Sequence, residues 1–546
     1  MKSWMWRNIW DEKSMSATMR SQNLYSLLTL FIVLIHQLTI VDGSYCPSDC
    51  KCDDETLMVN CNEGHLDVLP IALNPSIQRL VIKNNKIKTI DSSIQFYSEL
   101  IFLDLSYNHL IHIPERTFQY QKKLQELHLN HNKIGAISNK TLNGLTSLTV
   151  LNLRGNFLDS LDDEVFVQLG KLEELNLGAN RITKIAPNAF KGLNNLRLLY
   201  LDDNILTIMP IIALKSMSNL AEFYAGTNSF TTIPKGTFSE MNGLTKLELK
   251  GAGLRNISEG SFEGLENLRI LDLSDNHLEK VPTEEMGSLT RLEELYLGQN
   301  DFTVIKEDAL KGLNNLKTLE ITGTLNLKTV EKGAFNTNTN LETLNLSSNK
   351  KLEEIQEGAL SGLPHLKTVI LRENALTSLP EGMFPWSELK TLDISSNTFH
   401  CDCKILWLKN LVASKNATNE GLDNILCSSP EILKDQPLRS VSADVLGCDH
   451  SDPHKQAIIA AVLVGVAASI TALVLLLFHC RKRIREALKG GWGNSALGRK
   501  EREYQKTFHE DDYMTRFNQN SCSLVHPNQF NYNNGQNVRP IPVTEL

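Results

Sequence analysis

Hydrophobic positions recur with a fixed period along more than half of the chain. The stretch from Leu124 to Ile134, LQELHLNHNKI, shows the pattern L-x-x-L-x-L-x-x-N-x-L. Leu127 and Leu129 alternate with His128, which predicts a short strand with one buried side and one exposed side. Asn132 follows the strand, and its amide can pair with backbone groups of the turn that would otherwise be buried without partners.

The asparagine position marks fourteen copies of this pattern, spaced 23 to 25 residues apart. One copy cannot close a hydrophobic core, but stacked copies can. The period therefore predicts an α/β fold over residues 77–398, a right-handed leucine-rich repeat solenoid whose parallel β-sheet forms a horseshoe. The marking residues are Asn85, Asn108, Asn132, Asn156, Asn180, Asn204, Asn228, Ala252, Asn276, Asn300, Thr324, Asn349, Asn374 and Asn397.

Two repeats lack the asparagine. Ala252 and Thr324 cannot make the same hydrogen bonds with the turn. These positions are interpreted either as tolerated weak rungs or as points where the solenoid flexes.

Cysteines flank the repeats and are absent from them. Of the ten cysteines, four precede the array and four follow it. Two even sets around a solenoid predict disulfide-stapled caps over residues 44–76 and 399–449, which cover the leucines of the end repeats. A zinc site is the weaker alternative, because no histidine spacing supports it. The spacing leaves the connectivity open among Cys46, Cys50, Cys52, Cys61, Cys401, Cys403, Cys427 and Cys448.

Two apolar segments predict the topology. The first, LYSLLTLFIVLIHQLTIV at 24–41, favours a secretory signal over residues 1–43, with an uncleaved anchor as the alternative and Met15 or Met19 as possible starts. The second predicts a membrane helix over 457–479 after a short stalk at 450–456. The 22 uncharged residues from Ala457 to Phe478 would span roughly 33 Å, enough for a hydrocarbon core of ~30 Å. Arg481 and Lys482 follow, so the positive-inside rule predicts a type I plasma-membrane protein with extracellular repeats.

The predicted cytoplasmic tail, 480–546, is too short for a large signalling domain, and its composition predicts disorder. Thr544 and Leu546 fit the terminal pattern bound by PDZ domains, so a cytoplasmic PDZ protein is a candidate partner. Cys480 at the membrane edge is a palmitoylation candidate, or an ordinary free thiol. In the predicted extracellular part, Asn-x-Ser/Thr matches give candidate glycan acceptors at Asn139, Asn256, Asn345 and Asn416.

No enzyme, cofactor or metal site is expected. The sequence contains no H-E-x-x-H, P-loop, G-x-S-x-G or kinase signature, and its formal charge of −8 argues against a nucleic-acid binder. The expected chemistry is protein recognition on the concave face. Adjacent rungs there carry tyrosines beside charges, which suits a partner with basic groups; packing of the tyrosines along the ladder is the alternative. The candidate partner-binding residues are Arg197, Tyr200, Glu222, Tyr224, Glu248, Asp272 and Tyr296.

The segments CPSDCKC and HCDCKILWL resemble the flanking modules of extracellular leucine-rich repeat proteins. That resemblance implies the disulfides Cys46–Cys52, Cys50–Cys61, Cys401–Cys427 and Cys403–Cys448.

The plan of fourteen repeats, two caps, one membrane helix and a short tail resembles the Capricious and Tartan group of insects. It implies cell–cell recognition in development, such as neuronal target selection, by homophilic or heterophilic contact. A signalling co-receptor that couples a bound ligand to its tail is the alternative. Toll-like receptors share the ectodomain style, but the signalling domain that they require is missing here.

Overall fold

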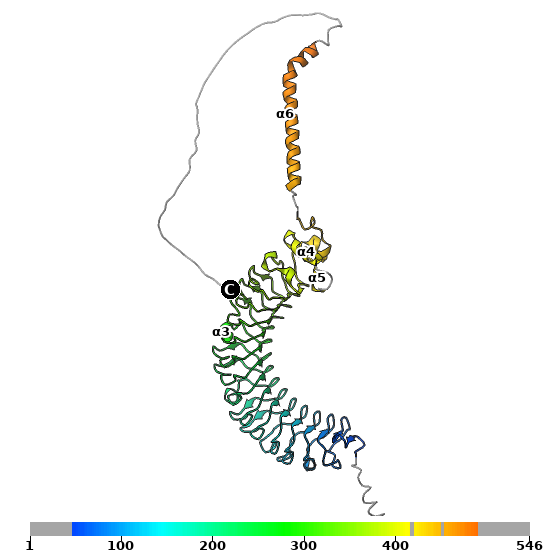
Figure 1. Ribbon diagram of the computed structural model, residues 1–546, viewed down its shortest axis with the longest axis vertical. Helices are drawn as coiled ribbons and strands as arrows, with labels where there is room; N and C mark the ends of the chain where they lie inside the picture. Colours follow the sequence, from blue (N-terminus) through cyan, green and yellow to red (C-terminus); the bar gives the residue numbers. More distant parts are fainter. Residues whose placement is uncertain (1–45, 415–419, 449–452, 490–546) are drawn as a thin grey trace, which may run out of the picture. The chain divides into compact units, whose positions relative to one another are not determined.

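The structure, a computed structural model, describes residues 46–414, 420–448 and 453–489. The first two ranges form one compact unit, and the third is a helix that is described by itself. The predicted signal segment and residues 490–546 lie outside the described residues. The first unit is a curved solenoid (Figure 1).

One long sheet runs through all the repeats. Fourteen parallel strands, one per repeat, follow an antiparallel pair in the amino-terminal cap, as the repeat period predicts. The cap strands are β1 (Lys51–Asp53) and β2 (Met58–Asn60). The repeat strands are β3 (Arg79–Val81), β4 (Phe102–Asp104), β5 (Glu126–His128), β6 (Val150–Asn152), β8 (Glu174–Asn176), β10 (Leu198–Tyr200), β11 (Glu222–Tyr224), β13 (Lys246–Glu248), β15 (Ile270–Asp272), β16 (Glu294–Tyr296), β18 (Thr318–Glu320), β20 (Thr343–Asn345), β22 (Thr368–Ile370) and β23 (Thr391–Asp393).

The opposite side of the solenoid carries short strands and single helical turns. Its strands pair in groups of two or three. They are β7 (Ser160–Leu161), β9 (Lys184–Ile185), β12 (Thr232–Ile233), β14 (Asn256–Ile257), β17 (Val304–Ile305), β19 (Thr329–Val330) and β21 (Glu354–Ile355). The turns are η1 (Ser92–Phe96), α2 (Ile211–Leu214), α3 (Thr283–Met286), η2 (Glu381–Met383) and η3 (Trp386–Glu388).

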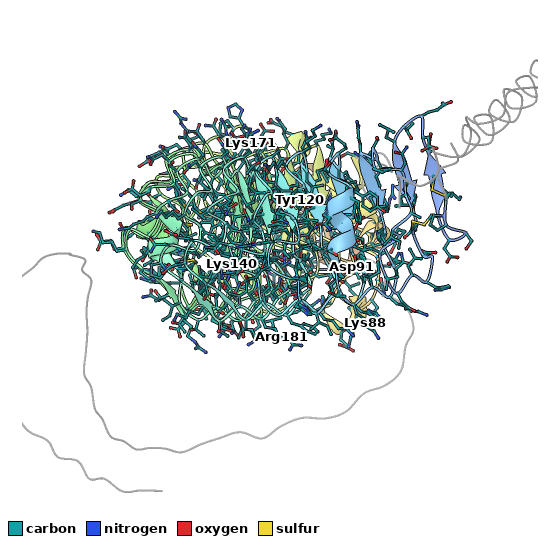
Figure 2. All side chains as sticks on the ribbon, turned by 90° about the horizontal axis from the view of Figure 1, so that it is seen from below. Lys88, Asp91, Tyr120, Lys140, Lys171 and Arg181 are labelled. Atoms are coloured by element: carbon teal, nitrogen blue, oxygen red, sulfur yellow. A yellow bond between two sulfur atoms is a disulfide. The ribbon has the colours of Figure 1, made fainter. Side chains whose placement is uncertain are left out.

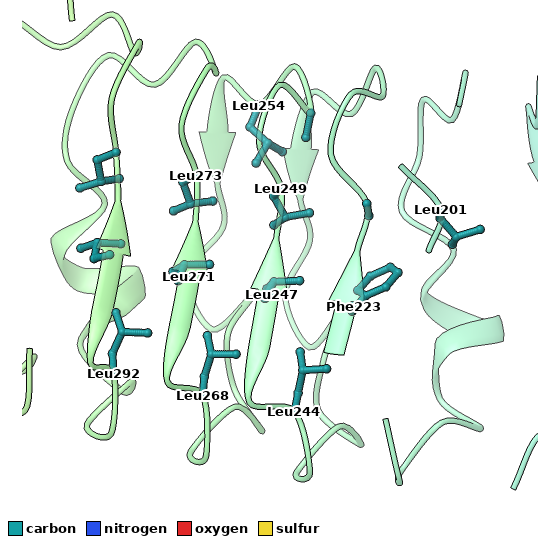
Figure 3. Close-up of a cluster of buried hydrophobic side chains, with 14 of the residues drawn as sticks. Leu201, Phe223, Leu244, Leu247, Leu249, Leu254, Leu268, Leu271, Leu273 and Leu292 are labelled. Carbon is teal, nitrogen blue, oxygen red and sulfur yellow. The ribbon is translucent and has the colours of Figure 1, made fainter. Parts of the chain in front are cut away.

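The leucines of neighbouring repeats form one continuous core. The middle residue of every repeat strand is buried, and the strands are in register, so Leu247 lies beside Leu271. Figure 3 shows these two side chains, with Leu249 and Leu273 above them, on the same side of the sheet. Each repeat therefore buries its apolar side chains against its neighbours, as the pattern predicts.

The inward asparagines form a ladder of hydrogen bonds. Asn132 Nδ2 donates to the carbonyl oxygens of Leu105 (3.0 Å) and Leu129 (2.9 Å), and its Oδ1 accepts from the N–H of Leu110 (3.0 Å). Each asparagine thus joins its own repeat to the preceding one. These bonds satisfy backbone groups that the stacked repeats bury.

The two substituted rungs differ from each other. At Ala252 the backbone replaces the missing amide, because the Ala252 carbonyl accepts from the N–H of Phe230 at 2.8 Å. At Thr324 the side-chain hydroxyl is buried and has no hydrogen-bond partner. The first rung is repaired locally, whereas the second leaves a polar group unsatisfied.

The residue before each inward position has a left-handed backbone. This holds in all fourteen repeats, and the φ values lie between 47° and 68°. Gly155, Gly251 and Gly323 adopt this conformation easily, but β-branched Thr227 does so only at a cost. The other residues at this position are Asn84, Tyr107, His131, Ala179, Asp203, Asp275, Gln299, Ser348, Glu373 and Ser396.

Disulfides close both ends of the core, and the bonded pairs are Cys46–Cys52, Cys50–Cys61, Cys401–Cys427 and Cys403–Cys448. These are the pairs that the resemblance implies. In the carboxy-terminal cap, Trp407 stacks on Trp386 at 5.7 Å and donates from Nε1 to the Leu379 carbonyl, so the cap covers the last repeats. The cap elements are η4 (Cys403–Ile405), α4 (Leu406–Ser414), α5 (Glu420–Asp423), η5 (Glu431–Leu433) and η6 (Leu438–Ser440).

The separate helix α6 spans Pro453–Lys489. Its segment Ala457–Lys482 is long and apolar enough to cross a membrane. The helix starts inside the predicted stalk, since proline suits a first helical turn. It also continues ten residues past the predicted end at 479, so the expectation of disorder from residue 480 is wrong for 480–489. Between Gly465 and Gly490 no glycine or proline occurs that would end the helix at residue 479.

Candidate functional site

The long sheet offers an open face with one outward side chain in the third position of each strand. Figure 1 shows the helical turn α3 on the outer side of the arc, so the long sheet lines the inner, concave side. This file of side chains runs without interruption through the in-register strands. A surface of this kind can contact one partner over many repeats.

Two tyrosines pack against each other at the centre of this face. Tyr200 in β10 and Tyr224 in β11 are partners in register, and their rings stack with centroids 4.6 Å apart. Tyr224 Oη donates to Glu222 Oε2 at 2.6 Å, and Lys246 Nζ lies 4.8 Å from the Tyr224 ring. Burial raises the pKa of Tyr224, and the Glu222 bond adds to this effect. The pair is held rigidly and remains half-exposed.

Carboxylates continue the file beyond the tyrosines. Glu248, Asp272, Tyr296 and Glu320 occupy the next four rungs. Burial, followed by the nearby Asp272 carboxylate, raises the pKa of both Glu248 and Glu320. None of these three acids forms a salt bridge within the described part of the chain. Negative charge is therefore concentrated and only partly solvated here, which favours a cationic partner group.

A salt bridge beside the tyrosines was not anticipated from the sequence. Arg154 Nη1 lies 2.8 Å from Asp202 Oδ2, although these residues are two repeats apart. Gly178 occupies the same position in the intervening repeat, and a Cβ there would collide with Arg154 Nη1. The available signal was a glycine between two opposite charges at equivalent positions.

The structure gathers most of the predicted partner-binding residues. Tyr200, Tyr224, Glu248, Asp272 and Tyr296 lie on five successive rungs, and Glu222 is bound to the second tyrosine. Arg197 precedes β10, where its backbone carbonyl accepts from the N–H groups of Ala221 and Glu222. The stacking of Tyr200 on Tyr224 agrees with the alternative interpretation, in which the tyrosines pack along the sheet. The stacking nevertheless leaves both tyrosines accessible.

The predicted modification sites are distributed over different surfaces. Asn345 stands in β20 on the concave face, where its Oδ1 accepts from Ser347 N (3.1 Å) and Oγ (2.8 Å). Asn256 is exposed in β14 on the outer side, and Asn139 is partly buried. Cys480 is a free, partly exposed thiol in α6. Asn416, Thr544 and Leu546 lie outside the described residues.

Comparison with known proteins agrees with this architecture. The family described as "Leucine rich repeat" matches residues 98–158, 146–206, 218–278, 266–326 and 315–369. The protein is a leucine-rich repeat solenoid. Among solved structures, the array is similar to the TLR13–ssRNA13 complex (TM-score 0.51, 26% identity, 68% of this chain and 62% of that one). It also shares its fold with the Drosophila Toll–Spatzle complex (TM-score 0.57, 21% identity, 70% and 54%).

Curated relatives match shorter parts of this leucine-rich repeat chain. Human Reticulon-4 receptor-like 2 is 35% identical over 104 residues, which cover 19% of this chain and 24% of the relative. Human platelet glycoprotein IX is 34% identical over 80 residues, covering 14% and 44%. Mouse Tsukushi is 27% identical over 123 residues, covering 20% and 35%. The chain thus spans less than half the length of each of these relatives.

Proposed function

We propose that this leucine-rich repeat protein is a cell-surface recognition receptor that binds another protein on its concave face. The observation that carries this proposal is the stacked, half-exposed Tyr200–Tyr224 pair beside acids without a salt-bridge partner in the described residues. Rigid aromatic side chains contribute large contact areas at a small entropic cost, and they are common anchors of protein interfaces. The partner would present an apolar or aromatic group next to basic side chains.

The proposed topology is that of a type I plasma-membrane protein, with a signal over residues 1–43 and extracellular, glycosylated repeats. The apolar segment Ala457–Lys482 supports a single membrane span, and Arg481 and Lys482 favour a cytoplasmic carboxy terminus. Four disulfides agree with folding in an oxidising compartment. In this arrangement Cys480 would be available for palmitoylation, and Thr544 and Leu546 for a cytoplasmic PDZ protein.

A glycan on Asn345 would restrict where the partner binds. Asn345 lies on the concave face, one rung beyond Glu320. Its Oδ1 accepts two hydrogen bonds, whereas no bond of its Nδ2 is found in the described structure. A glycan attached at Nδ2 would close this part of the concave face to a partner and would leave Tyr200 and Tyr224, six and five rungs away, accessible.

The proposed biological role is recognition between cells during development, including neuronal target selection. It is supported by the resemblance to the Capricious and Tartan group, which combines capped repeats, one membrane helix and a short tail. Contact in such a role is homophilic or heterophilic, and the two modes predict different outcomes when cells are mixed.

A mixed aggregation assay tests the proposal. Non-adherent cells that display the full-length chain are combined with differently labelled cells that lack it. Clusters of expressing cells alone would establish homophilic recognition, and clusters containing both labels would establish a different surface partner. Normal surface display without clusters would contradict an adhesive role and favour the signalling co-receptor.

A tail-deleted chain separates adhesion from signalling. Removal of residues 490–546 leaves the described membrane helix and repeats intact. Adhesion through the ectodomain should survive this deletion, because the binding face is unchanged. A cellular response that needs the tail should be lost.

A further inference from the structure

A second surface, on one edge of the first five repeats, carries an unusual concentration of positive charge. The residues that follow the inward asparagines there are all exposed. We define these five residues as the basic edge: Lys86, His109, Lys133, Phe157 and Arg181. In-register stacking places them in one row, one residue per repeat.

Neighbouring turn residues strengthen the charge of this row. In the five turn segments 84–89, 107–112, 131–136, 155–160 and 179–184, only Asp159 is acidic. The same segments add four more exposed basic or imidazole side chains, namely Lys88, His112, His131 and Lys184. Figure 2 shows Lys88 and Arg181 on the same edge of the solenoid, with Lys171 on the opposite edge.

The lysine and arginine side chains of this row have no acidic salt-bridge partner in the described residues, and acidic residues flank the row on both sides. No lysine or arginine of these segments forms a salt bridge within the described residues. Acids bound the row on both sides, with Glu63 and Asp67 in the cap and Asp203 in the sixth repeat. In the ninth and tenth repeats, Asp275 and Asp301 occupy the same kind of turn segment. In the twelfth repeat Lys350 also follows the inward Asn349, but it forms a salt bridge with Glu373. Unpaired positive charge is therefore concentrated on the first five repeats of this edge.

Aromatic rings lie among these cations. Tyr107 stacks on His131 with ring centroids 4.4 Å apart, and Lys83 Nζ lies 5.3 Å from the Tyr107 ring. The Arg181 guanidinium lies 4.2 Å from the centre of the Phe157 ring. Flat apolar faces next to cations suit a ligand that has both C–H surfaces and anionic groups.

We propose that the basic edge binds a linear sulfated polysaccharide. Strands ~4.8 Å apart give five rungs a length of roughly 20 Å, and the row takes one residue from each successive repeat along that length. This shape fits a single extended chain better than a flat membrane. Sulfates would accept charge-assisted hydrogen bonds from lysine and arginine, and sugar rings would pack on Tyr107 and Phe157. The choice of a sulfated sugar over a nucleic acid rests on the extracellular placement proposed above.

The test uses the full-length chain in detergent micelles and immobilised heparin at about 0.15 M ionic strength. Lys86→Glu, Lys133→Glu and Arg181→Glu are combined in one variant. The matched control combines Lys122→Glu, Lys171→Glu and Lys215→Glu, which are exposed lysines outside the edge and outside any salt bridge of the described residues. Both variants change the net charge equally.

We expect the edge variant to bind heparin at least about tenfold more weakly, while the control changes affinity by less than about twofold. Desulfated heparin should fail to compete. The proposal is overturned if both variants lose heparin affinity equally or if the unmodified chain does not bind heparin. It is likewise overturned if the unmodified chain binds RNA or anionic phospholipid vesicles more tightly than heparin. It is also overturned if the edge variant abolishes self-association of the chain and leaves heparin binding intact. Clustering of cells that display the chain is measured independently of heparin binding. A negative heparin result therefore leaves the concave-face proposal standing.

Discussion

Arg154 Nη1 and Asp202 Oδ2 lie 2.8 Å apart across an entire intervening repeat, in which Gly178 provides the space for the arginine side chain. Their side chains are 34% and 21% exposed, so water weakens this pair only in part. The second oxygen, Asp202 Oδ1, is buried without a hydrogen-bond partner. The pair adjoins the tyrosine stack and ties three repeats together beside the proposed binding face.

Replacement of Gly178 by alanine should break this salt bridge. The new methyl group would displace the Arg154 guanidinium and leave the Asp202 carboxylate poorly compensated. We expect a loss of about 1 kcal/mol in the free energy of unfolding, measured by urea denaturation. Gly135→Ala is the matched control, because no atom lies within 4 Å of its Cβ position. Equal losses in the two variants would mean that the effect comes from the backbone alone.

Thr324→Val should stabilise the array. The Thr324 hydroxyl is buried and unpaired, and valine has almost the same shape without the polar group. We expect the free energy of unfolding to rise by about 1 kcal/mol. Thr237→Val should lower the free energy of unfolding by a similar amount, because the buried Thr237 Oγ1 donates to the Pro234 carbonyl at 2.7 Å. Thermal melting of both variants checks the opposite signs, and destabilisation by Thr324→Val would show that the hydroxyl is in fact compensated.

Thr227→Gly should also stabilise the protein. Thr227 is exposed and has a φ of 47°, which strains a β-branched residue and suits glycine. Relief of this strain should raise the free energy of unfolding by about 1 kcal/mol. This gain should exceed the loss that comes from the greater freedom of glycine in the unfolded chain. Thr303→Gly, at an exposed position without positive φ, should cost about 1 kcal/mol. A loss of stability in the Thr227 variant would indicate that the turn relaxes around the threonine.

The concave acids predict a pH-dependent stability. Burial and Asp272 raise the pKa of Glu248, so its favourable contribution is complete below its unfolded-state pKa and is lost as the pH rises through its folded-state value. Glu248→Gln should therefore raise the melting temperature at pH 7, and the difference should vanish near about pH 3.5. Glu342 provides the opposite case, because the hydrogen bond from Lys367 lowers its pKa. Glu342→Gln should lower the melting temperature at pH 7, and the same sign in both variants would contradict this account.

Charge introduced on the tyrosine pair should abolish partner binding. Tyr200→Asp combined with Tyr224→Asp removes the stacked surface, and we expect a loss of at least about 2 kcal/mol in binding, measured as cell clustering at matched surface display. Asn152→Asp with Asn176→Asp is the control. It adds the same charge to the same file and keeps the oxygens that accept from Arg154 N and Gly178 N. Undiminished clustering by the tyrosine variant would place the partner elsewhere.

The sequence by itself determined the repeat architecture, because a fixed period of buried leucines has one economical solution, the stacked solenoid. It also identified the concave file, since the alternation around positions such as Leu127 fixes which side chains face outward. The apolar segment from Ala457 indicated a membrane helix, although helix-forming residues carry α6 further than polarity suggested.

Only the tertiary structure decided how side chains from different repeats meet. The Arg154–Asp202 bridge requires a glycine in the repeat between them, and the unpaired hydroxyl of Thr324 depends on its burial. The backbone repair at Ala252 depends on the conformation of two flanking glycines with positive φ. Periodicity specifies which positions point inward, but it carries no information on how far a long side chain reaches along the stack. That reach depends on the size of the neighbouring side chains in three dimensions.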